Sequence, residues 1–288
     1  MTAPASATQP EYVLGTDPAE LERLGLQHRL WSDAAHSAWM RAGLAPGMNV
    51  LDVGCGPGFA AFDMAQIVAA VGPGEAGGPG KVVGVDESAP YLEHLHAQAT
   101  GRGLRNLSSI QSDVTALASI PTLSPASFDF AYTRWVLCFV KDPAAVVRGV
   151  SRLLKPGAKW VIQDYFNYEA MCTAPRVESF AKAVRATGQS WRTRGGDPDI
   201  IARLPALLES SGMRVEHLGV TQRLARPGEP MWHWPQSFWR NFLPVLVKMG
   251  LLTDADRAQW ERDWIELAKK PGAFVLLPAV FDLIAVKN

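Results

Sequence analysis

The chain has 288 residues, which suffices for one large domain or for one domain that carries a smaller insertion. Lysine plus arginine and aspartate plus glutamate both number 28, so there is no excess of basic charge to bind a nucleic-acid backbone. The three scattered cysteines, Cys55, Cys138 and Cys172, form no CxxC pair and predict neither a disulfide framework nor a zinc site.

The N-terminal segment, residues 1–11, is small and polar, and we expect it to be disordered. It lacks the basic and apolar stretches of a secretory leader. The most apolar late run, Phe274–Val286, is interrupted by Pro278 and Asp282 and falls short of the ~20 apolar residues that a membrane helix needs. We therefore expect a cytoplasmic protein, monomeric or homodimeric, whose partner is a small molecule and neither a membrane nor a nucleic acid.

Residues 12–47 have the spacing of two helices that precede the core and cover its ligand site. The first is predicted to begin at Asp17-Pro18, because aspartate caps a helix well and proline suits its first turn. The second is predicted from Gln27 to Ala42, where apolar residues recur at helical spacing, and the glycines and proline that follow end it.

Residues 48–165 alternate between short apolar runs and helical stretches of ten or more residues. This alternation is typical of buried parallel strands joined by crossover helices, and it predicts a doubly wound α/β core. The strands are expected at residues 49–53, 81–86, 107–111, 128–133 and 159–165.

The remaining chain adds two strands and two insertions. Residues 197–224 are predicted to form a core helix and a strand, and residues 273–288 the last core strand. Residues 166–196 and 225–272 lie outside the regular alternation and are expected to be helical, the second as a lid, because such long connections must hold structure of their own. Six of the ten tryptophans lie between Trp191 and Trp264, within these parts.

An acidic residue and a glycine-rich turn follow the first predicted strand, in the run Asp52-Val53-Gly54-Cys55-Gly56-Pro57-Gly58. Glycine allows a tight turn and lets a ligand approach the backbone without meeting a Cβ. A dinucleotide fingerprint would need a further glycine where Phe59 stands, and the Gly-Lys-Ser/Thr end of a phosphate-binding loop is absent. The carboxylate of Asp52 suits a ligand that carries a positive amino group.

This run resembles motif I of the class I S-adenosylmethionine-dependent methyltransferases, in their ubiquinone-biosynthesis-like group. The next strand ends in Asp86, which resembles the acid that accepts hydrogen bonds from both ribose hydroxyls in that family. Gln111-Ser112-Asp113-Val114 is similar to the segment whose acid meets the adenine amino group and whose next residue covers the ring. Thr133-Arg134-Trp135 resembles the loop that faces the sulfonium and the substrate, and Leu153-Leu154-Lys155-Pro156-Gly157 the turn before the fifth strand.

The resemblance covers residues 43–165 and implies a Rossmann-like, seven-stranded sheet that is mostly parallel with an antiparallel last strand. It also implies that S-adenosylmethionine is the cofactor and S-adenosylhomocysteine its product. No metal-binding residues are predicted. The residues expected to bind the cofactor are Tyr12, Gln27, Asp52, Gly54, Cys55, Gly56, Gly58, Asp86, Glu87, Asp113, Val114, Thr133 and Arg134. Those expected to bind the acceptor are Trp135, Tyr165, Tyr168, Trp232 and Trp234.

The expected reaction is methyl transfer to a small acceptor by in-line displacement. Because the cofactor is already an activated electrophile, alignment of the nucleophile can suffice. A base is needed only for an acceptor that arrives protonated, and His233, between two tryptophans, is the candidate. The many aromatic residues favour an apolar or aromatic acceptor, with oxygen, nitrogen and carbon all open as the methylated atom. The alternatives are a sensor or partner subunit that binds the cofactor without turnover, and a nicotinamide-dependent oxidoreductase.

Overall fold

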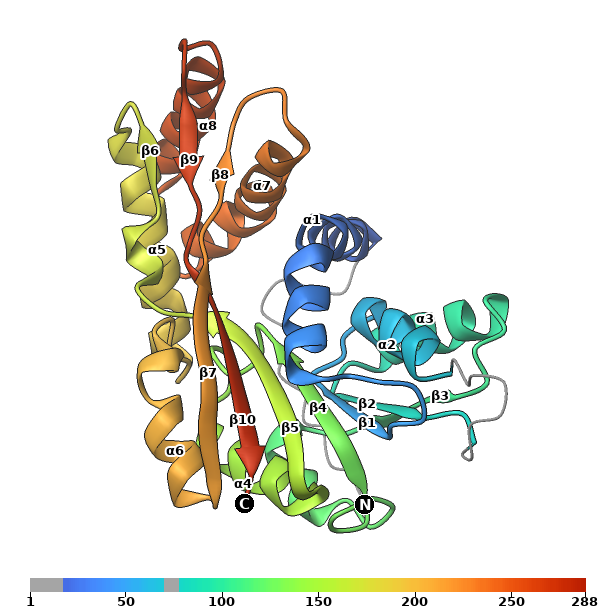
Figure 1. Ribbon diagram of the computed structural model, residues 1–288. Coiled ribbons are helices and arrows are strands. Elements are labelled where there is room, and N and C mark those ends of the chain that lie inside the picture. The colour runs from blue at the N-terminus through green and yellow to red at the C-terminus, as the bar shows by residue number, and fades with distance from the viewer. Residues whose placement is uncertain (1–17, 70–77) are drawn as a thin grey trace, which may run out of the picture.

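A seven-stranded sheet forms the centre of the molecule in the computed structural model, which describes residues 18–69 and 78–288 (Figure 1). Its strand order is β3-β2-β1-β4-β5-β10-β7. Strands β1 to β5 pair in parallel, whereas β10 runs antiparallel to both of its neighbours, β5 and β7. The strands are β1 (Val50–Val53), β2 (Val82–Asp86), β3 (Leu107–Gln111), β4 (Phe128–Arg134), β5 (Leu154–Tyr165), β7 (Met213–Thr221) and β10 (Val280–Lys287). The predicted sheet, with its antiparallel last strand, is confirmed.

Helices cover both faces of this sheet. They are α1 (Pro18–Ala42), α2 (Phe59–Ala69) and α3 (Ala89–Gly101) on one side, and α4 (Pro143–Leu153) and α6 (Leu204–Ser210) on the other (Figure 1). Successive residues of a strand point to opposite faces. Val50 accordingly packs into the cluster that contains Ala61 and Trp39, and Leu51 into the cluster that contains Val150. This two-faced burial explains why the central strands β1, β2 and β4 are mainly apolar.

A second layer lies beyond the carboxyl ends of the parallel strands and forms a lid (Figure 1). It consists of the helices α5 (Glu178–Thr193), α7 (His233–Lys248) and α8 (Asp254–Ala268) and a small antiparallel sheet of β6 (Cys172–Ala174), β9 (Phe274–Leu276) and β8 (Leu224–Ala225). The Thr253 hydroxyl and the Asp256 carboxylate cap α8 reciprocally, as a capping box does. Aromatic rings fill the inside of the lid, for example Trp232 against Trp264 with ring centroids 4.2 Å apart.

The N-terminal segment differs from its prediction, because one helix replaces the two that were expected. Gly25 lies within α1 and does not end it. A Cβ at this position would come within 3.2 Å of the Phe59 ring, so the glycine lets α1 approach α2 closely. This close approach carries α1 across the sheet, where Trp39 contacts Tyr132 with ring centroids 5.1 Å apart.

The last two predicted strands also differ from prediction, because each one is divided between the two sheets. Residues 213–221 remain in the large sheet as β7, and Leu224–Ala225 continue in the small sheet as β8. In the same way β9 precedes β10, with Pro278 in the break. Proline cannot donate a ladder hydrogen bond, so it favours an interruption of the strand there. At these two breaks the chain passes from the core into the lid and back again.

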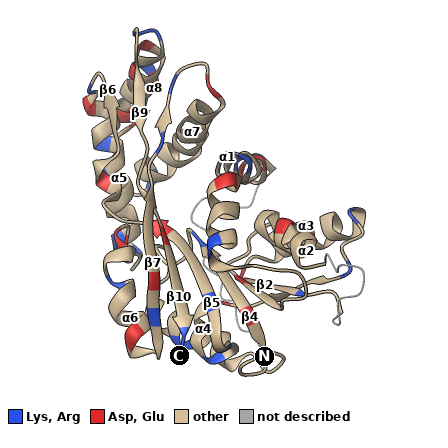
Figure 2. Cartoon of the chain, viewed as in Figure 1, with Lys and Arg blue, Asp and Glu red and all other residues tan. Residues whose placement is uncertain are grey.

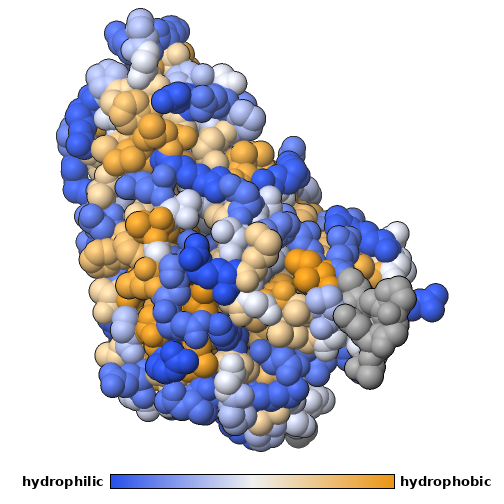
Figure 3. Space-filling model, viewed as in Figure 1, coloured by the Kyte–Doolittle hydropathy of each residue, from blue (hydrophilic) through white to orange (hydrophobic). Residues whose placement is uncertain are grey.

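Basic and acidic residues are interspersed along the outer helices (Figure 2). Exposed apolar residues form separate patches on the face in Figure 3, divided by polar ones. Among the exposed apolar residues are Leu218 and Val220 on the edge strand β7, each about half exposed. No helix among the described residues has the length and apolar character to cross a membrane.

Candidate active site

Three glycines shape the turn after β1, and each has a positive φ, of +71° at Gly54, +52° at Gly56 and +87° at Gly58. A side chain at Gly54 would overlap the methyl groups of Val136, and one at Gly58 would come within 2.7 Å of Leu95. A Cβ at Gly56 would meet no atom of the described residues within 4 Å, its chain neighbours aside. Packing therefore requires glycine at the first and third positions, whereas the second leaves open space for a ligand.

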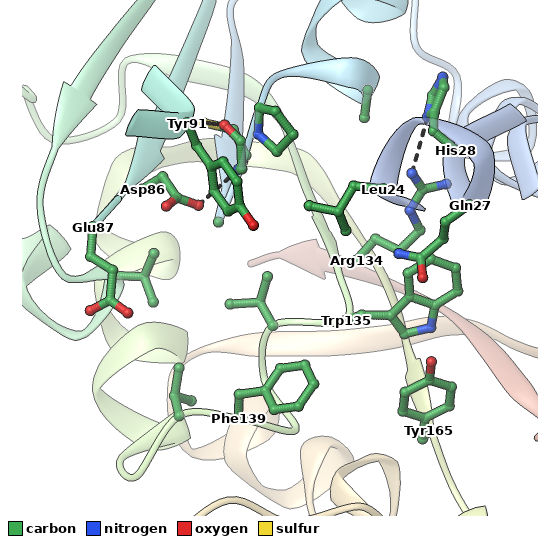
Figure 4. A pocket seen from close by; sticks show the side chains of 18 of the residues that line it. Leu24, Gln27, His28, Asp86, Glu87, Tyr91, Arg134, Trp135, Phe139 and Tyr165 are labelled. Carbon is green, nitrogen blue, oxygen red and sulfur yellow. Dashed lines mark hydrogen bonds between the residues drawn. The ribbon is translucent and has the colours of Figure 1, made fainter. Parts of the chain in front are cut away.

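Asp86 stands at the end of β2 and fixes this turn. Its Oδ2 accepts a hydrogen bond from the Gly56 amide at 2.8 Å, and its Oδ1 accepts one from the Ser88 amide at 2.9 Å. Burial raises the pKa of Asp86, while the amides of Ser88 and Gly56 oppose the rise. Asp86 and Glu87 lie at the same end of the cavity as Tyr91 (Figure 4). Two anions and a ring at this end suit a ligand with hydroxyl and amino groups.

Asp52 lies deeper in the same wall, on β1, and is 2% exposed. Its Oδ2 has no hydrogen-bond partner among the described residues. Burial raises the pKa of Asp52 to about 7, Asp86 adds to the rise, and the Arg134 guanidinium opposes it. A buried carboxylate oxygen without a partner is costly. This oxygen is therefore an acceptor available to a ligand's ammonium group.

A chain of hydrogen bonds fixes Arg134 at the end of β4. Arg134 donates from Nη2 to His28 Nδ1 at 3.1 Å, and His28 Nε2 lies 3.1 Å from Asp63 Oδ2 (Figure 4). Because arginine only donates, His28 Nδ1 must accept, so its Nε2 carries the proton and donates to Asp63. Burial lowers the pKa of His28. Both ring nitrogens are thus engaged, and His28 positions Arg134 without a free nitrogen to act as a base.

Gln27 links α1 to the lid. Its Oε1 accepts hydrogen bonds from Arg23 Nη1 at 3.0 Å and from Trp234 Nε1 at 2.9 Å. These two donors identify the oxygen of the amide, which leaves the nitrogen as the end with protons to offer. Gln27 also lines the cavity, beside Arg134 and Trp135 (Figure 4).

Aromatic rings form the opposite end of the cavity. Trp135 stacks on Tyr165 with centroids 6.0 Å apart and on Trp234 with centroids 5.9 Å apart. Tyr165 in turn stacks on Trp191 at 5.9 Å, and Trp191 meets Phe139 edge to face at 4.8 Å. The backbone of Trp135 has a φ of +53°, a strained value for a bulky residue, and such strain is concentrated at functional sites. We call these five residues the aromatic wall.

One cavity of about 740 Å³ joins the acidic end to the aromatic wall (Figure 4). This volume lies within the ~300–1,000 Å³ typical of small-molecule sites. The predicted residues that line it are Gln27, Asp52, Gly54, Cys55, Gly56, Asp86, Glu87, Asp113, Val114, Arg134, Trp135, Tyr165, Tyr168 and Trp234.

Five predicted residues do not belong to the described cavity wall. Gly58 packs on Leu95, and Thr133 accepts a hydrogen bond from Trp160 Nε1 at 2.9 Å. Trp232 packs inside the lid, and His233 is exposed, with Nδ1 3.3 Å from Gln236 Oε1. Tyr12 lies outside the described residues.

Sequence reasoning missed several residues of the cavity wall, namely Arg23, Leu24, His28, Tyr91, Phe139, Trp191, Arg194 and Phe238. Arg23 and Leu24 precede Gln27 by four and three residues, and His28 follows Leu24 by four. This helical spacing places them on one face of α1 and was the signal that could have found them. Trp191 and Arg194 come from the lid, and no local pattern indicates which lid residues face inward.

Comparison with known proteins gives consistent matches. Residues 44–203 match a family model described as a methyltransferase domain. The chain is 35% identical over 168 residues to the ubiquinone biosynthesis O-methyltransferase of Paracidovorax citrulli, covering 54% of this chain and 64% of that one. It is 33% identical over 168 residues to the enzyme of the same name from Albidiferax ferrireducens, covering 54% and 60%. The matches thus span less than two thirds of these relatives.

Solved structures resemble the fold at low sequence identity. The YcgJ protein of Bacillus subtilis superposes with a TM-score of 0.58 and 16% identity, over 88% of this chain and 99% of that one. The [4+2]-cyclase SpnF superposes with a TM-score of 0.54 and 19% identity, over 88% and 80%. At such identities the likeness is one of architecture.

Proposed function

Because the chain belongs to the class I S-adenosylmethionine-dependent methyltransferases, we propose that it transfers a methyl group from this cofactor to a small, apolar or aromatic acceptor. The observation that carries the proposal is the cavity of about 740 Å³, which joins an acidic end to an aromatic wall. A methyl donor and an acceptor must meet in one enclosed space for an in-line displacement.

The residues at the acidic end fit the cofactor. Asp86 retains free lone pairs beyond its two amide partners, and these suit a ribose diol. The open space at Gly56 suits a ligand that runs close to the backbone. The unpartnered Oδ2 of Asp52 suits the ammonium group of the amino-acid part, and Arg134, whose Nη1 also lacks a partner among the described residues, suits its carboxylate.

When bound, S-adenosylmethionine supplies a methyl group on a sulfonium leaving group. The chain's own residues then position the acceptor and exclude water, which is the task of Trp135, Tyr165 and Trp234. Burial raises the pKa of Tyr165 and of Tyr168, so their hydroxyls stay protonated. With both nitrogens of His28 engaged, neither this histidine nor the two tyrosines can act as a free base. We infer that the acceptor arrives as a ready nucleophile or loses its proton to solvent.

The test is incubation with methyl-labelled S-adenosylmethionine and a panel of phenols, carboxylic acids and amines, followed by mass spectrometry. A labelled product from the wild type, lost with Asp86→Ala, is the expected result. Asp86→Ala should weaken binding of S-adenosylhomocysteine by at least tenfold in calorimetry, because charge-assisted hydrogen bonds contribute about 1.5–3 kcal/mol each. Asp129→Ala, an acid outside the cavity wall, is the control. Tight binding with no product from any acceptor class would favour a sensor.

A further inference from the structure

Two cationic side chains, Lys141 and Arg194, line the cavity beside the aromatic wall. Lys141 follows Phe139 in the loop after β4, and Arg194 follows Trp191 at the end of α5. The two segments touch, because a Cβ at Gly195 would lie 2.9 Å from Lys141 Cγ. The stem of the Lys141 side chain therefore lies against the backbone next to Arg194, so adjacent segments contribute the two residues to the wall.

Neither charge has an anionic partner within salt-bridge distance among the described residues. Arg194 donates from Nη2 to the sulfur of Met249 at 3.4 Å, and its buried Nη1 has no hydrogen-bond partner in the described parts of the chain. Lys141 is exposed, and no ion pair joins it to a described acid. By contrast Arg23, which also lines the cavity, holds Glu20 at 2.6 Å.

The acids nearest in sequence are engaged elsewhere. Asp142 also lines the cavity, but it accepts a hydrogen bond from the Ala145 amide at 2.9 Å as the cap of α4 and faces Arg148 at 3.7 Å. Asp197 accepts from the Asp199 amide at 2.9 Å and from Arg203 at 3.3 Å. The position of Arg194 at the C-terminus of α5 accounts for a cation there, since the helix dipole favours one. It does not account for the buried Nη1 of Arg194, because a buried donor without a hydrogen-bond acceptor destabilises the fold.

We propose that Lys141 and Arg194 bind a carboxylate carried by the acceptor, whose apolar part packs against the aromatic wall. The inference rests on the proposed function and narrows its substrate to an aromatic or apolar acid. Rings alone would also suit a cationic amine, because cations bind over aromatic faces. Lys141 and Arg194 outnumber Asp142, the acid that follows Lys141 in the wall and is engaged by the Ala145 amide and Arg148. The excess of positive charge favours an anionic ligand over a cationic one.

The experiment compares three probes that share one ring system, 2-naphthoate, 2-naphthalenemethanol and 2-naphthylmethylammonium. Their affinities are measured by calorimetry with the protein saturated in S-adenosylhomocysteine. We expect naphthoate to bind at least tenfold more tightly than the alcohol and the ammonium compound to bind most weakly. The advantage of naphthoate should shrink as NaCl rises from 50 to 500 mM, because salt screens charges that are partly exposed.

Substitutions assign the preference to the two residues. Lys141→Gln and Arg194→Gln together should abolish the advantage of naphthoate and leave the alcohol and S-adenosylhomocysteine within twofold of wild type. Lys141→Gln alone changes an exposed residue, keeps the fold and should remove part of the advantage. Arg185→Gln makes the same change of charge on α5 outside the cavity wall and should have no effect.

Three outcomes would overturn the inference. The first is equal affinity for the three probes, or no binding of any of them. The second is tightest binding of the ammonium compound. The third is a loss of S-adenosylhomocysteine affinity in the double variant, which would assign the two cations to the cofactor. In each of these cases the wild type still binds S-adenosylhomocysteine, so the proposed function stands. Failure of the wild type to bind it would overturn both.

Discussion

Asp52 combines complete burial with a carboxylate oxygen that lacks a partner among the described residues. With its pKa raised to about 7, first by burial, it is largely protonated at pH 6 and largely ionised at pH 8. Only the ionised form can pair with an ammonium group. We predict that S-adenosylhomocysteine binds up to about tenfold more tightly at pH 8 than at pH 6, and that Asp52→Asn weakens binding and removes this pH dependence in calorimetry.

The same carboxyl should lower stability. Its folded-state pKa lies above its ordinary 3.8, so the folded state binds more protons than the unfolded state between these values, and stability falls as pH rises through them. The loss of stability caused by the ionised Asp52 is absent near pH 4 and complete above pH 7. Asp52→Asn should therefore raise the free energy of unfolding in urea by on the order of 2–4 kcal/mol at pH 8 and little at pH 4. An equal gain at both pH values would contradict this assignment.

The acids and glycines of the cofactor end could be predicted because local sequence determines them. A strand end, a tight turn and a carboxylate two residues before it stand next to one another in the chain. The partner of Arg134 could not be predicted, since His28 lies 106 residues away and reaches Arg134 only because α1 crosses the sheet. The placement of His233 outside the cavity wall has the same cause, because the orientation of α7 depends on packing within the lid.

At the scale of elements, Arg223 joins the lid to α1. It donates from Nη1 to the Leu30 carbonyl at 2.7 Å and from Nη2 to Asp33 at 2.8 Å, and its guanidinium lies 4.5 Å from the Trp31 ring. The Asp33 side chain is 72% exposed, so the ion pair itself contributes little. The backbone hydrogen bond and the cation–π contact should dominate.

We predict that Arg223→Ala lowers the free energy of unfolding in urea by about 1–2 kcal/mol. Asp33→Asn, which removes only the ion pair, should cost less than about 0.5 kcal/mol. Hydrogen exchange of the α1 amides should accelerate in Arg223→Ala and stay unchanged in the control Arg226→Ala, whose exposed side chain lies 4.0 Å from Glu229. Equal costs for Arg223→Ala and Asp33→Asn would mean that the ion pair dominates.

Elements of the core were easier to predict than those of the lid. The central parallel strands are mainly apolar runs, which the sequence makes visible. By contrast, β6, β8 and β9 have three, two and three residues and carry no periodicity of their own. β8 follows the core strand β7 and β9 precedes the core strand β10, and the two pair with each other beyond the large sheet. Such pairing depends on the positions at which the core strands end, which no local pattern shows.

At the scale of the whole molecule, the cavity belongs to three parts at once, because the core supplies Trp135, α1 supplies Gln27 and the lid supplies Trp234. The hydrogen bond from Trp234 Nε1 to Gln27 closes this junction at 2.9 Å. The sequence places both insertions at the carboxyl edge of the sheet, and a lid at that edge follows from strand order. Which of its six tryptophans face the acceptor depends on helix rotation, which the sequence does not fix.

Trp234 lines the cavity and donates a hydrogen bond to Gln27, whereas its neighbour His233 lies outside the described cavity wall. The two residues should therefore have different roles. We predict that Trp234→Phe, which keeps an aromatic ring but removes the Nε1 donor, lowers turnover about tenfold, equivalent to about 1.4 kcal/mol in the transition state. Affinity for S-adenosylhomocysteine should stay within threefold, because Gln27 keeps its hydrogen bond from Arg23. His233→Ala should leave turnover within twofold at every pH, because the imidazole is exposed outside the cavity wall. A loss with His233→Ala that fades for acceptors already ionised would instead identify His233 as a base, which would require α7 to turn toward the cavity during turnover.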